Sequence, residues 1–147
     1  MAKMAEFVRV AVDAMGGDNA PAEIVKGAVQ AVEADGRIQV CLVGKRDVIE
    51  RELAALSAPK DRVEIVDATE VIETAEPPVN AIRKKKDSSI VKGLGLVKSG
   101  DCDAFVSAGS TGAVLVGGQV LVGRAKGVER PPLAPLIPTE KGVSLLI

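Results

Sequence analysis

The sequence predicts an α/β fold of three layers, α/β/α, with a mostly parallel sheet. Short apolar segments alternate with segments of helical periodicity, in the order strand, helix, strand, helix, strand. This alternation is typical of parallel strands whose connecting helices cover both faces of the sheet. The chain has 147 residues, of which 47% are apolar, which is enough to bury the core of a single domain over residues 1–147.

The first half of the chain contains the clearest elements. Valine-rich segments predict three strands, and apolar residues at helical spacing predict two helices between them. The strands are expected at 8–12, 40–43 and 63–66, and the helices at 22–34 and 47–56. Asp18 or Asn19 is expected to cap the first helix, and Asp47, in D-x-x-E spacing with Glu50, is expected to cap the second.

The second half begins with a long polar segment. Residues 67–87 contain two prolines, a dense cluster of acids and then four consecutive basic residues, which predict a functional or mobile loop. Ser88 or Ser89 is expected to open the helix that follows, and Ser99-Gly100 to end it. The elements expected here are a short helix at 79–85, a helix to residue 99, a strand at 104–107 and a helix that carries 114–122.

The C-terminal segment is rich in proline. Prolines at 131, 132, 135 and 138 are poorly tolerated in a central strand, so this part is expected to be an edge strand or a crossing connection. Residues 143–147 predict a final strand, because four of the five are apolar. A domain rarely ends on such a segment unless it is tied into the sheet. We therefore expect the chain to be the N-terminal part of a longer protein.

Composition excludes several classes of function. The chain has no histidine, which excludes a Ser-His-Asp triad and a Cys-His pair and removes the commonest zinc ligand, so neither a metal nor a cofactor is expected. A net charge of −1 with 1% aromatic residues disfavours nucleic acid. Cys41 and Cys102 are expected to be free thiols in a reducing cytosol. The sequence shows neither a signal peptide nor an apolar run long enough to cross a membrane.

The segment from Val8 to Pro21, VRVAVDAMGGDNAP, runs a strand into a glycine pair and then into a helix start. Gly16 and Gly17 would expose main-chain amides to an anion, and Asp13 and Asp18 flank them. The alternative is an ordinary turn between a strand and a helix, with a capping aspartate. Spacing alone leaves both interpretations open.

The segment SAGSTG, residues 107–112, again lies where a strand meets a helix. Small residues and hydroxyls there suit an oxyanion or phosphate, with Ser110 and Thr111 adding O–H donors to free helix amides. The alternative is that one of these two residues caps the helix, which does not exclude phosphate binding. The segment lacks the lysine of a Walker motif and does not match the dinucleotide-binding fingerprint. The sequence therefore disfavours a nucleotide cofactor at this segment.

Residues 83–86, RKKK, are followed by Asp87, Ser88 and Ser89. Four cations beside two hydroxyls could hold phosphate or dock an acidic protein surface. The alternative is a solvated basic turn, which is the usual meaning of a charge run alone.

These motifs together resemble one family. DAMGGD followed by NAP, PVNAIRKKKDSS, SAGSTGA and the proline-rich segment at 123–139 are similar, in order, to segments of the bacterial phosphate acyltransferases of phospholipid synthesis, the PlsX family. Two positions depart from the family pattern: Asn19 stands where histidine is usual, and Ser110 where asparagine is usual.

The resemblance implies a fold of the phosphotransacetylase and isopropylmalate dehydrogenase lineage. It also implies transfer of a long-chain acyl group from acyl-acyl carrier protein to inorganic phosphate, for bacterial phospholipid synthesis. The carrier protein and phosphate would be the partners of a cytoplasmic homodimer that contacts the membrane peripherally. Two alternatives stay open: a non-catalytic half that binds phosphate or the carrier protein, and a dehydrogenase of the related fold.

Site residues follow from the motifs and the resemblance together. Phosphate is expected to be bound by amides and hydroxyls, with Lys85 or Lys86 neutralising charge. Asp13 and Asp18 are expected to shape the loop and orient donors, because a carboxylate beside phosphate repels it. The predicted binding residues are Gly16, Gly17, Ser88, Ser107, Gly109, Ser110, Thr111 and Gly112.

Overall fold

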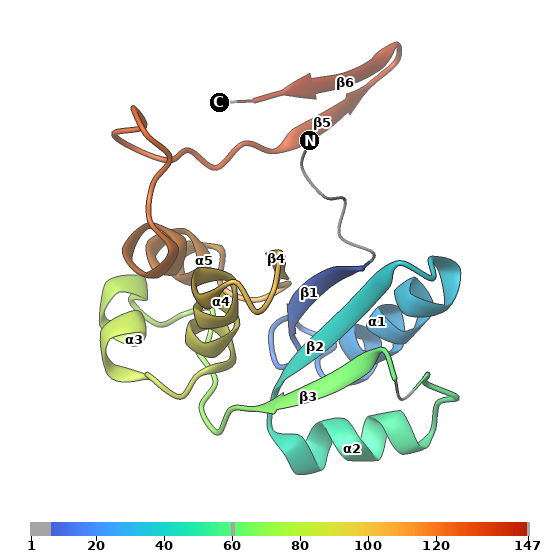
Figure 1. The fold of residues 1–147 in the computed structure, drawn as a ribbon. Helices are drawn as coiled ribbons and strands as arrows, with labels where there is room; N and C mark the ends of the chain where they lie inside the picture. Colours follow the sequence, from blue (N-terminus) through green and yellow to red (C-terminus); the bar gives the residue numbers. More distant parts are fainter. Residues whose placement is uncertain (1–6, 60, 147) are drawn as a thin grey trace.

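A four-stranded parallel sheet forms the centre of the molecule in a computed structural model, which describes residues 7–59 and 61–146. The strand order is β3-β2-β1-β4, so β1 lies between β2 and β4. Figure 1 shows helices on both sides of this sheet, which confirms the predicted fold class. The strands are β1 (Val8–Asp13), β2 (Ile38–Gly44), β3 (Val63–Asp67) and β4 (Ala104–Val106).

The helices form two layers, one on each face of the sheet. One layer contains α1 and α2, which pack on β2, and the other contains α4, which crosses β1 and β2 with α3 and α5 beside it (Figure 1). The last helix continues from α5 into one π-helical segment, η1. The bounds are α1 (Ala22–Ala34), α2 (Arg46–Ala54), α3 (Pro78–Lys84), α4 (Ser89–Ser99), α5 (Thr111–Gly117) and η1 (Gly118–Val122).

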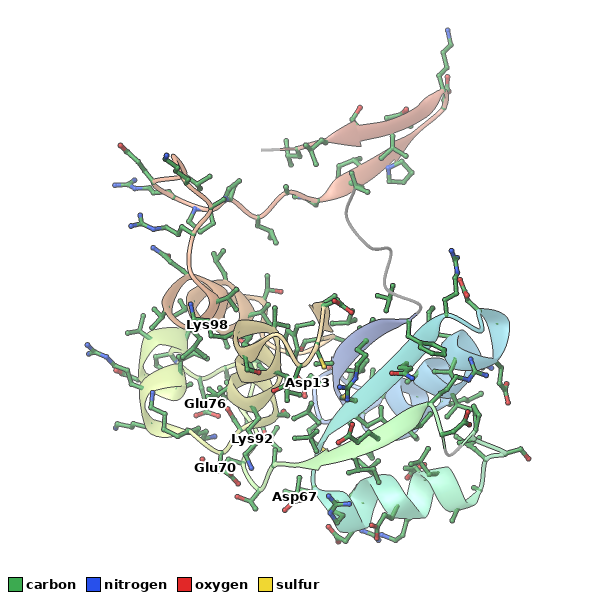
Figure 2. All side chains as sticks on the ribbon, in the orientation of Figure 1. Asp13, Asp67, Glu70, Glu76, Lys92 and Lys98 are labelled. Carbon is green, nitrogen blue, oxygen red and sulfur yellow. The ribbon has the colours of Figure 1, made fainter. Side chains whose placement is uncertain are left out.

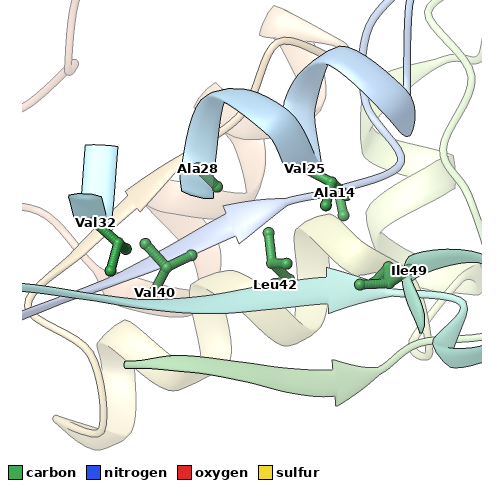
Figure 3. Packing of buried hydrophobic residues seen from close by; sticks show 7 residues of the cluster. All are labelled: Ala14, Val25, Ala28, Val32, Val40, Leu42 and Ile49. Atoms are coloured by element: carbon green, nitrogen blue, oxygen red, sulfur yellow. The ribbon is translucent and has the colours of Figure 1, made fainter. Parts of the chain in front are cut away.

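The first core lies between the sheet and α1 with α2. Figure 3 shows Val25, Ala28 and Val32 of α1 pointing at Val40 and Leu42 of β2, with Ile49 of α2 beside them. Leu42 and Ile49 are completely buried. Burying each such side chain contributes about 1.5–3 kcal/mol, so this cluster holds α1 and α2 on one face.

The second layer is held by alternate residues of the same strands. Ala11 and Cys41 point away from the first core and pack with Cys102, Leu96 and Val97 under α4. A further cluster joins the helices of this layer to each other. It consists of Ile72, Ala81, Ile82, Ile90, Leu94 and Ala113.

Two predicted helix caps are wrong. The residue before α1 is Pro21, which makes no side-chain cap, and Asn19 contributes only its main-chain carbonyl to the Glu23 N–H. Lys45 precedes α2, and the carboxylate that reaches the Arg46 N–H, at 3.0 Å, belongs to Asp67 at the end of β3. At α2 the physical reason is that the neighbouring strand supplies a carboxylate that local spacing cannot reveal.

The helix start predicted at Ser88 or Ser89 is confirmed at Ser88, and of the two residues named as alternative caps of the last helix, Ser110 makes the cap. Ser88 precedes α4 and its hydroxyl accepts from the Val91 N–H, and Ser110 precedes α5 and accepts from the Ala113 N–H. Both bonds span three residues, so the sequence carries all the information they need.

The C-terminal strand forms as expected but does not join the parallel sheet. β5 (Leu136–Thr139) and β6 (Gly142–Leu145) pair antiparallel with each other and form a separate two-stranded sheet (Figure 1). Ile147, the last residue of the predicted strand at 143–147, lies outside the described residues. Over the described part of the chain, no helix is long and apolar enough to cross a membrane.

Gly93 permits the close packing of α4 on β4, and this can be tested. A Cβ at Gly93 would lie 2.3 Å from Cε2 of the Phe105 ring, whereas a Cβ at Gly95, in the same helix, meets open space. Gly93→Ala should lower the free energy of unfolding by about 1–3 kcal/mol through overpacking. Gly95→Ala should raise it by up to about 1 kcal/mol through helix propensity. Urea unfolding followed by circular dichroism measures both, and equal stability of the two variants would contradict the packing.

Candidate functional site at the ends of β1 and β4

The candidate site lies where β1 and β4 end, side by side, at the carboxyl edge of the sheet. The helix that follows β1 packs on one face, and the helix that follows β4 belongs to the layer on the other face. The connections therefore diverge between these two strands, which makes this the topological switch point of the sheet. Ligands of open α/β sheets bind at such a point.

Asp13 joins the two loops that begin there. Its carboxylate is buried and accepts a hydrogen bond from the Ser107 hydroxyl at 2.8 Å and from the Met15 N–H at 3.1 Å. The Gly109 N–H donates in turn to the Ser107 oxygen at 3.0 Å. A buried carboxylate needs such donors. Asp13 thus acts on the second loop through Ser107, as a group that orients donors.

Glycine is required where the two loops touch. A Cβ at Gly16 would lie 2.4 Å from the Asp13 carboxylate and 2.9 Å from the Gly109 nitrogen. Gly17 has a φ of +108°, a left-handed conformation, and lies against Ala108. The structure therefore brings together the two predicted glycine-containing segments, the loop at 13–18 and the loop at 107–112, which lie more than ninety residues apart in the sequence. We call these two segments the glycine loops.

The start of α5 presents free donors beside this contact. The Ser110 hydroxyl is buried and is used in the cap, so the exposed hydroxyl of the segment is that of Thr111. The amides of Thr111 and Gly112 belong to the first helical turn, where main-chain N–H groups have no partner within the helix. Asp18, in the first loop, is exposed. This arrangement can bind an anion through hydroxyl and amide donors.

Gly112 also fixes the position of α3. A Cβ there would lie 2.7 Å from Cγ of Pro78, so the start of α3 lies against the start of α5. The basic run at the end of α3 is thereby held in the same layer as the second loop.

The basic run contains one partly buried side chain, that of Lys85, and three exposed ones, those of Arg83, Lys84 and Lys86. Lys85 Nζ is 2.5 Å from a Glu76 carboxylate oxygen and donates to the Val71 carbonyl at 2.6 Å, and this bond lowers the pKa of Glu76. Lys86 Nζ donates to the Ile82 carbonyl at 3.1 Å. Arg83 and Lys84 are exposed on α3.

Ser88 is fully buried, and its hydroxyl donates to the Lys85 carbonyl at 2.8 Å. Among the described residues, no hydrogen bond or ion pair joins Lys85, Lys86 or Ser88 to either glycine loop. The structure therefore brings Asp13 together with Gly16, Gly17, Ser107 and Gly109.

An ion-pair cluster that the sequence did not reveal holds the long loop. Lys92 Nζ lies 2.5 Å from the Asp87 carboxylate and donates to the Asp67 carbonyl at 2.6 Å. Thr69 donates to Asp87 from both its hydroxyl and its amide, at 2.6 and 2.9 Å. Figure 2 shows Asp67, Glu70 and Lys92 gathered where β3 ends and α4 begins. The cluster closes the loop at both of its ends.

Acid should weaken this cluster. The Lys92 ammonium and the two Thr69 donors hold the pKa of Asp87 well below its usual range. The unfolded chain takes up this proton near pH ~3.9, before the folded chain does, so the contribution of Asp87 is present above that pH and is lost below it. Asp87→Asn should therefore destabilise the protein near pH ~6, and this destabilisation should shrink progressively as the pH falls below ~3.9.

Urea unfolding of both proteins across this pH range measures the difference. Lys92→Met should show the same convergence at low pH, because it removes the same pair from the other side. A stability gap that stays constant with pH would show that Asp87 acts only through packing.

The fold and the loops define a class: an α/β domain with a parallel sheet and glycine- and hydroxyl-rich loops at the switch point. Within this class the chain belongs to the fatty acid synthesis protein family, whose model matches residues 8–147.

Individual relatives agree with this family. The chain is 51% identical over 140 residues to the phosphate acyltransferase of Clostridium beijerinckii and 48% identical to that of Thermoanaerobacter pseudethanolicus, in each case over 95% of this chain. It spans 42% and 41% of the length of these two relatives. A phosphotransacetylase from Streptococcus pyogenes has a similar fold, with a TM-score of 0.61 at 17% identity, over 93% of this chain and 44% of that one.

Proposed function

We propose that this chain forms the phosphate-binding part of an acyltransferase that moves a long-chain acyl group from acyl-acyl carrier protein to inorganic phosphate. The observation that carries the proposal is the contact of two donor-rich loops through Asp13 and Ser107 at the switch point of the sheet. The names of the relatives, phosphate acyltransferase, support the same reaction. Acyl phosphate, a precursor for bacterial phospholipid synthesis, would be the product.

The proposed chemistry suits a chain without histidine. Phosphate, with a second pKa of ~6 to 7, is in large part dianionic at neutral pH and can attack a thioester without a general base. An O–C bond forms, the C–S bond breaks, and the electron pair leaves with a thiolate whose conjugate acid has a pKa of ~8.5. The protein's task is then to position the phosphate and to stabilise charge.

Most of the predicted residues have a role in this scheme, but Ser88, which is buried and caps α4, has none. Thr111 and the amides of the two glycine loops donate to phosphate, and Asp13 orients the second loop through Ser107. Lys85 or Lys86 neutralises the accumulating charge. Lys85 would exchange its Glu76 partner for phosphate to do so.

The test is the release of carrier-protein thiol from acyl-acyl carrier protein as a function of phosphate concentration. Thr111→Ala should lower kcat/KM for phosphate by roughly 10- to 100-fold, because a hydrogen bond to a charged group is worth about 1.5–3 kcal/mol. Thr74→Ala removes another exposed threonine, away from the loops, and is the matched control. An unchanged phosphate dependence in Thr111→Ala would place the phosphate site elsewhere.

Asp18→Ala tests the first loop in the same assay. Asp18 is exposed, so the variant should fold normally, and we expect it to turn over more slowly if this carboxylate orients donors around the substrate. A folded chain that binds phosphate in a calorimetric titration but releases no thiol would support the non-catalytic alternative.

That alternative, a half that binds the carrier protein, is favoured by one observation. Arg83 and Lys84 are exposed on α3 and suit an acidic partner surface. Docking through them should weaken strongly between about 50 and about 500 mM salt, whereas a phosphate site formed by main-chain amides should change much less. The homodimer and the peripheral membrane contact are part of the same proposal. Sedimentation of the chain, alone and with vesicles of anionic phospholipid, tests both.

A further inference from the structure

The two cysteines of the chain lie against each other, although the sequence places them far apart. Cys41 is in β2, Cys102 is in the turn between α4 and β4, and both belong to the same buried cluster under α4. Both are free thiols, with exposed fractions of 2% and 3%. Burial, together with a hydrogen bond to the Cys41 sulfur, raises the pKa of the Cys102 thiol to about 12. The structure therefore holds a pair of thiols in contact.

The strand between the two cysteines allows this contact. Ala11 of β1 is the register partner of Cys41 and belongs to the same cluster, and its side chain is a single methyl group. The Asp103 N–H donates to the Arg9 carbonyl, and the Arg9 N–H donates to the Asp103 carboxylate, both at 2.8 Å. These bonds fix the turn that carries Cys102 beside β1, so the two thiols are held together by the sheet.

Cys41 has the surroundings of a reactive thiol. Arg9 Nη2 lies 3.5 Å from its sulfur and 2.7 Å from the Glu64 carboxylate, and the thiol donates to that carboxylate at 3.8 Å. A guanidinium beside a cysteine stabilises the thiolate, which is the nucleophilic form. The Glu64 side chain is 61% exposed, so it can accept the thiol proton and pass it to water.

A small pocket gives access to Cys41. It has a volume of about 170 Å³ and opens to solvent, and Arg9, Gln39, Cys41 and Glu64 are among the residues that line it. Within the part of the chain that the structure describes, Cys102 is not in this lining. A molecule the size of hydrogen peroxide would therefore meet Cys41 first and would reach Cys102 only through Cys41.

We propose that Cys41 and Cys102 are a modification site, a thiol pair that hydrogen peroxide converts into a reversible disulfide. The Cys41 thiolate attacks one peroxide oxygen, an S–O bond forms and the O–O bond breaks, and the departing hydroxide becomes water with the proton that Glu64 accepted. The Cys102 sulfur then attacks the Cys41 sulfur, the S–S bond forms and the S–O bond breaks, and the second hydroxide leaves as water with the Cys102 proton. Two thiols are oxidised, and one peroxide is reduced to two waters.

Inertness is the alternative, because buried thiols in apolar surroundings react slowly. Two observations favour the reactive pair. Arg9 and Glu64 place a cation and a proton acceptor at the Cys41 sulfur. The neighbouring Cys102 can capture the sulfenic acid before it is oxidised further. The bond would fasten β2 to the turn that precedes β4, across β1, and its formation is independent of the proposed acyl transfer.

Peptide mapping by mass spectrometry tests the proposal on this chain. The folded protein is treated with hydrogen peroxide, its remaining thiols are blocked with a maleimide in urea, and it is digested with trypsin without reduction. We expect two peptides linked through Cys41 and Cys102, which dithiothreitol separates. Cys102→Ser should stop the reaction at a Cys41 sulfenic acid, which dimedone traps. Cys41→Ser should leave Cys102 a free thiol.

The role of the guanidinium is tested separately. Arg9→Gln should slow the oxidation of Cys41 by at least about tenfold, because less of the thiol is then ionised. Arg9→Lys, which keeps a cation at this position, should recover part of the rate. Arg51→Gln removes another exposed arginine, in α2 on the opposite face of the sheet, and is the matched control that should oxidise at the original rate. Circular dichroism checks that each variant is folded.

Three results would overturn the proposal. Both thiols could stay free in the folded protein under peroxide treatment that oxidises them in urea, which would show that the pair is inert. Sulfinic acid at Cys41 with Cys102 still free would show that Cys102 does not capture the intermediate. A covalent dimer linked through Cys41, with no bond to Cys102 of the same chain, would make the modification intermolecular. Equal rates for Arg9→Gln and Arg51→Gln would contradict the role assigned to Arg9.

Discussion

The buried carboxylate of Asp13 is the constraint on which the site depends. It stands at the end of a central strand, where burial of a charge is costly unless donors surround it. Ser107 and the Met15 amide supply those donors, and Ser107 is in position only because β4 lies beside β1. The contact is so close that Gly16 has no room for a side chain. One electrostatic requirement therefore brings two distant loops into a single surface.

Small residues let the second helical layer approach that surface. Gly93 brings α4 onto the Phe105 ring of β4, and Gly112 brings the start of α5 onto Pro78 of α3. Further along α5, Gly117 lies against Leu94 and Ile82. Glycine is unfavourable inside a helix, but here each one lets a neighbouring side chain pack directly against the helix backbone. The loop after β4 is consequently held between two packed helices rather than at the end of a free segment.

Ion pairs control the long segment between β3 and α4. Lys92 and Thr69 hold Asp87 at one end, and Lys85 is held by Glu76 and a main-chain carbonyl further along. Of the basic run, Arg83, Lys84 and Lys86 are exposed. Residues that look equivalent in the sequence thus have separate physical roles: some stabilise the loop, and others remain available to a partner.

The sequence by itself determined what depends on neighbours a few residues away. Valine periodicity predicted β1 and β3 to within a residue or two, and the serine caps of α4 and α5 follow from bonds that span three residues. Tertiary structure alone decided the rest: the Asp67 contact at the start of α2, the Glu76 partner of Lys85, and the pairing of β1 with β4. Each of these joins groups that only the strand order and the helix layers bring within a few ångströms, and local periodicity carries no information about that order.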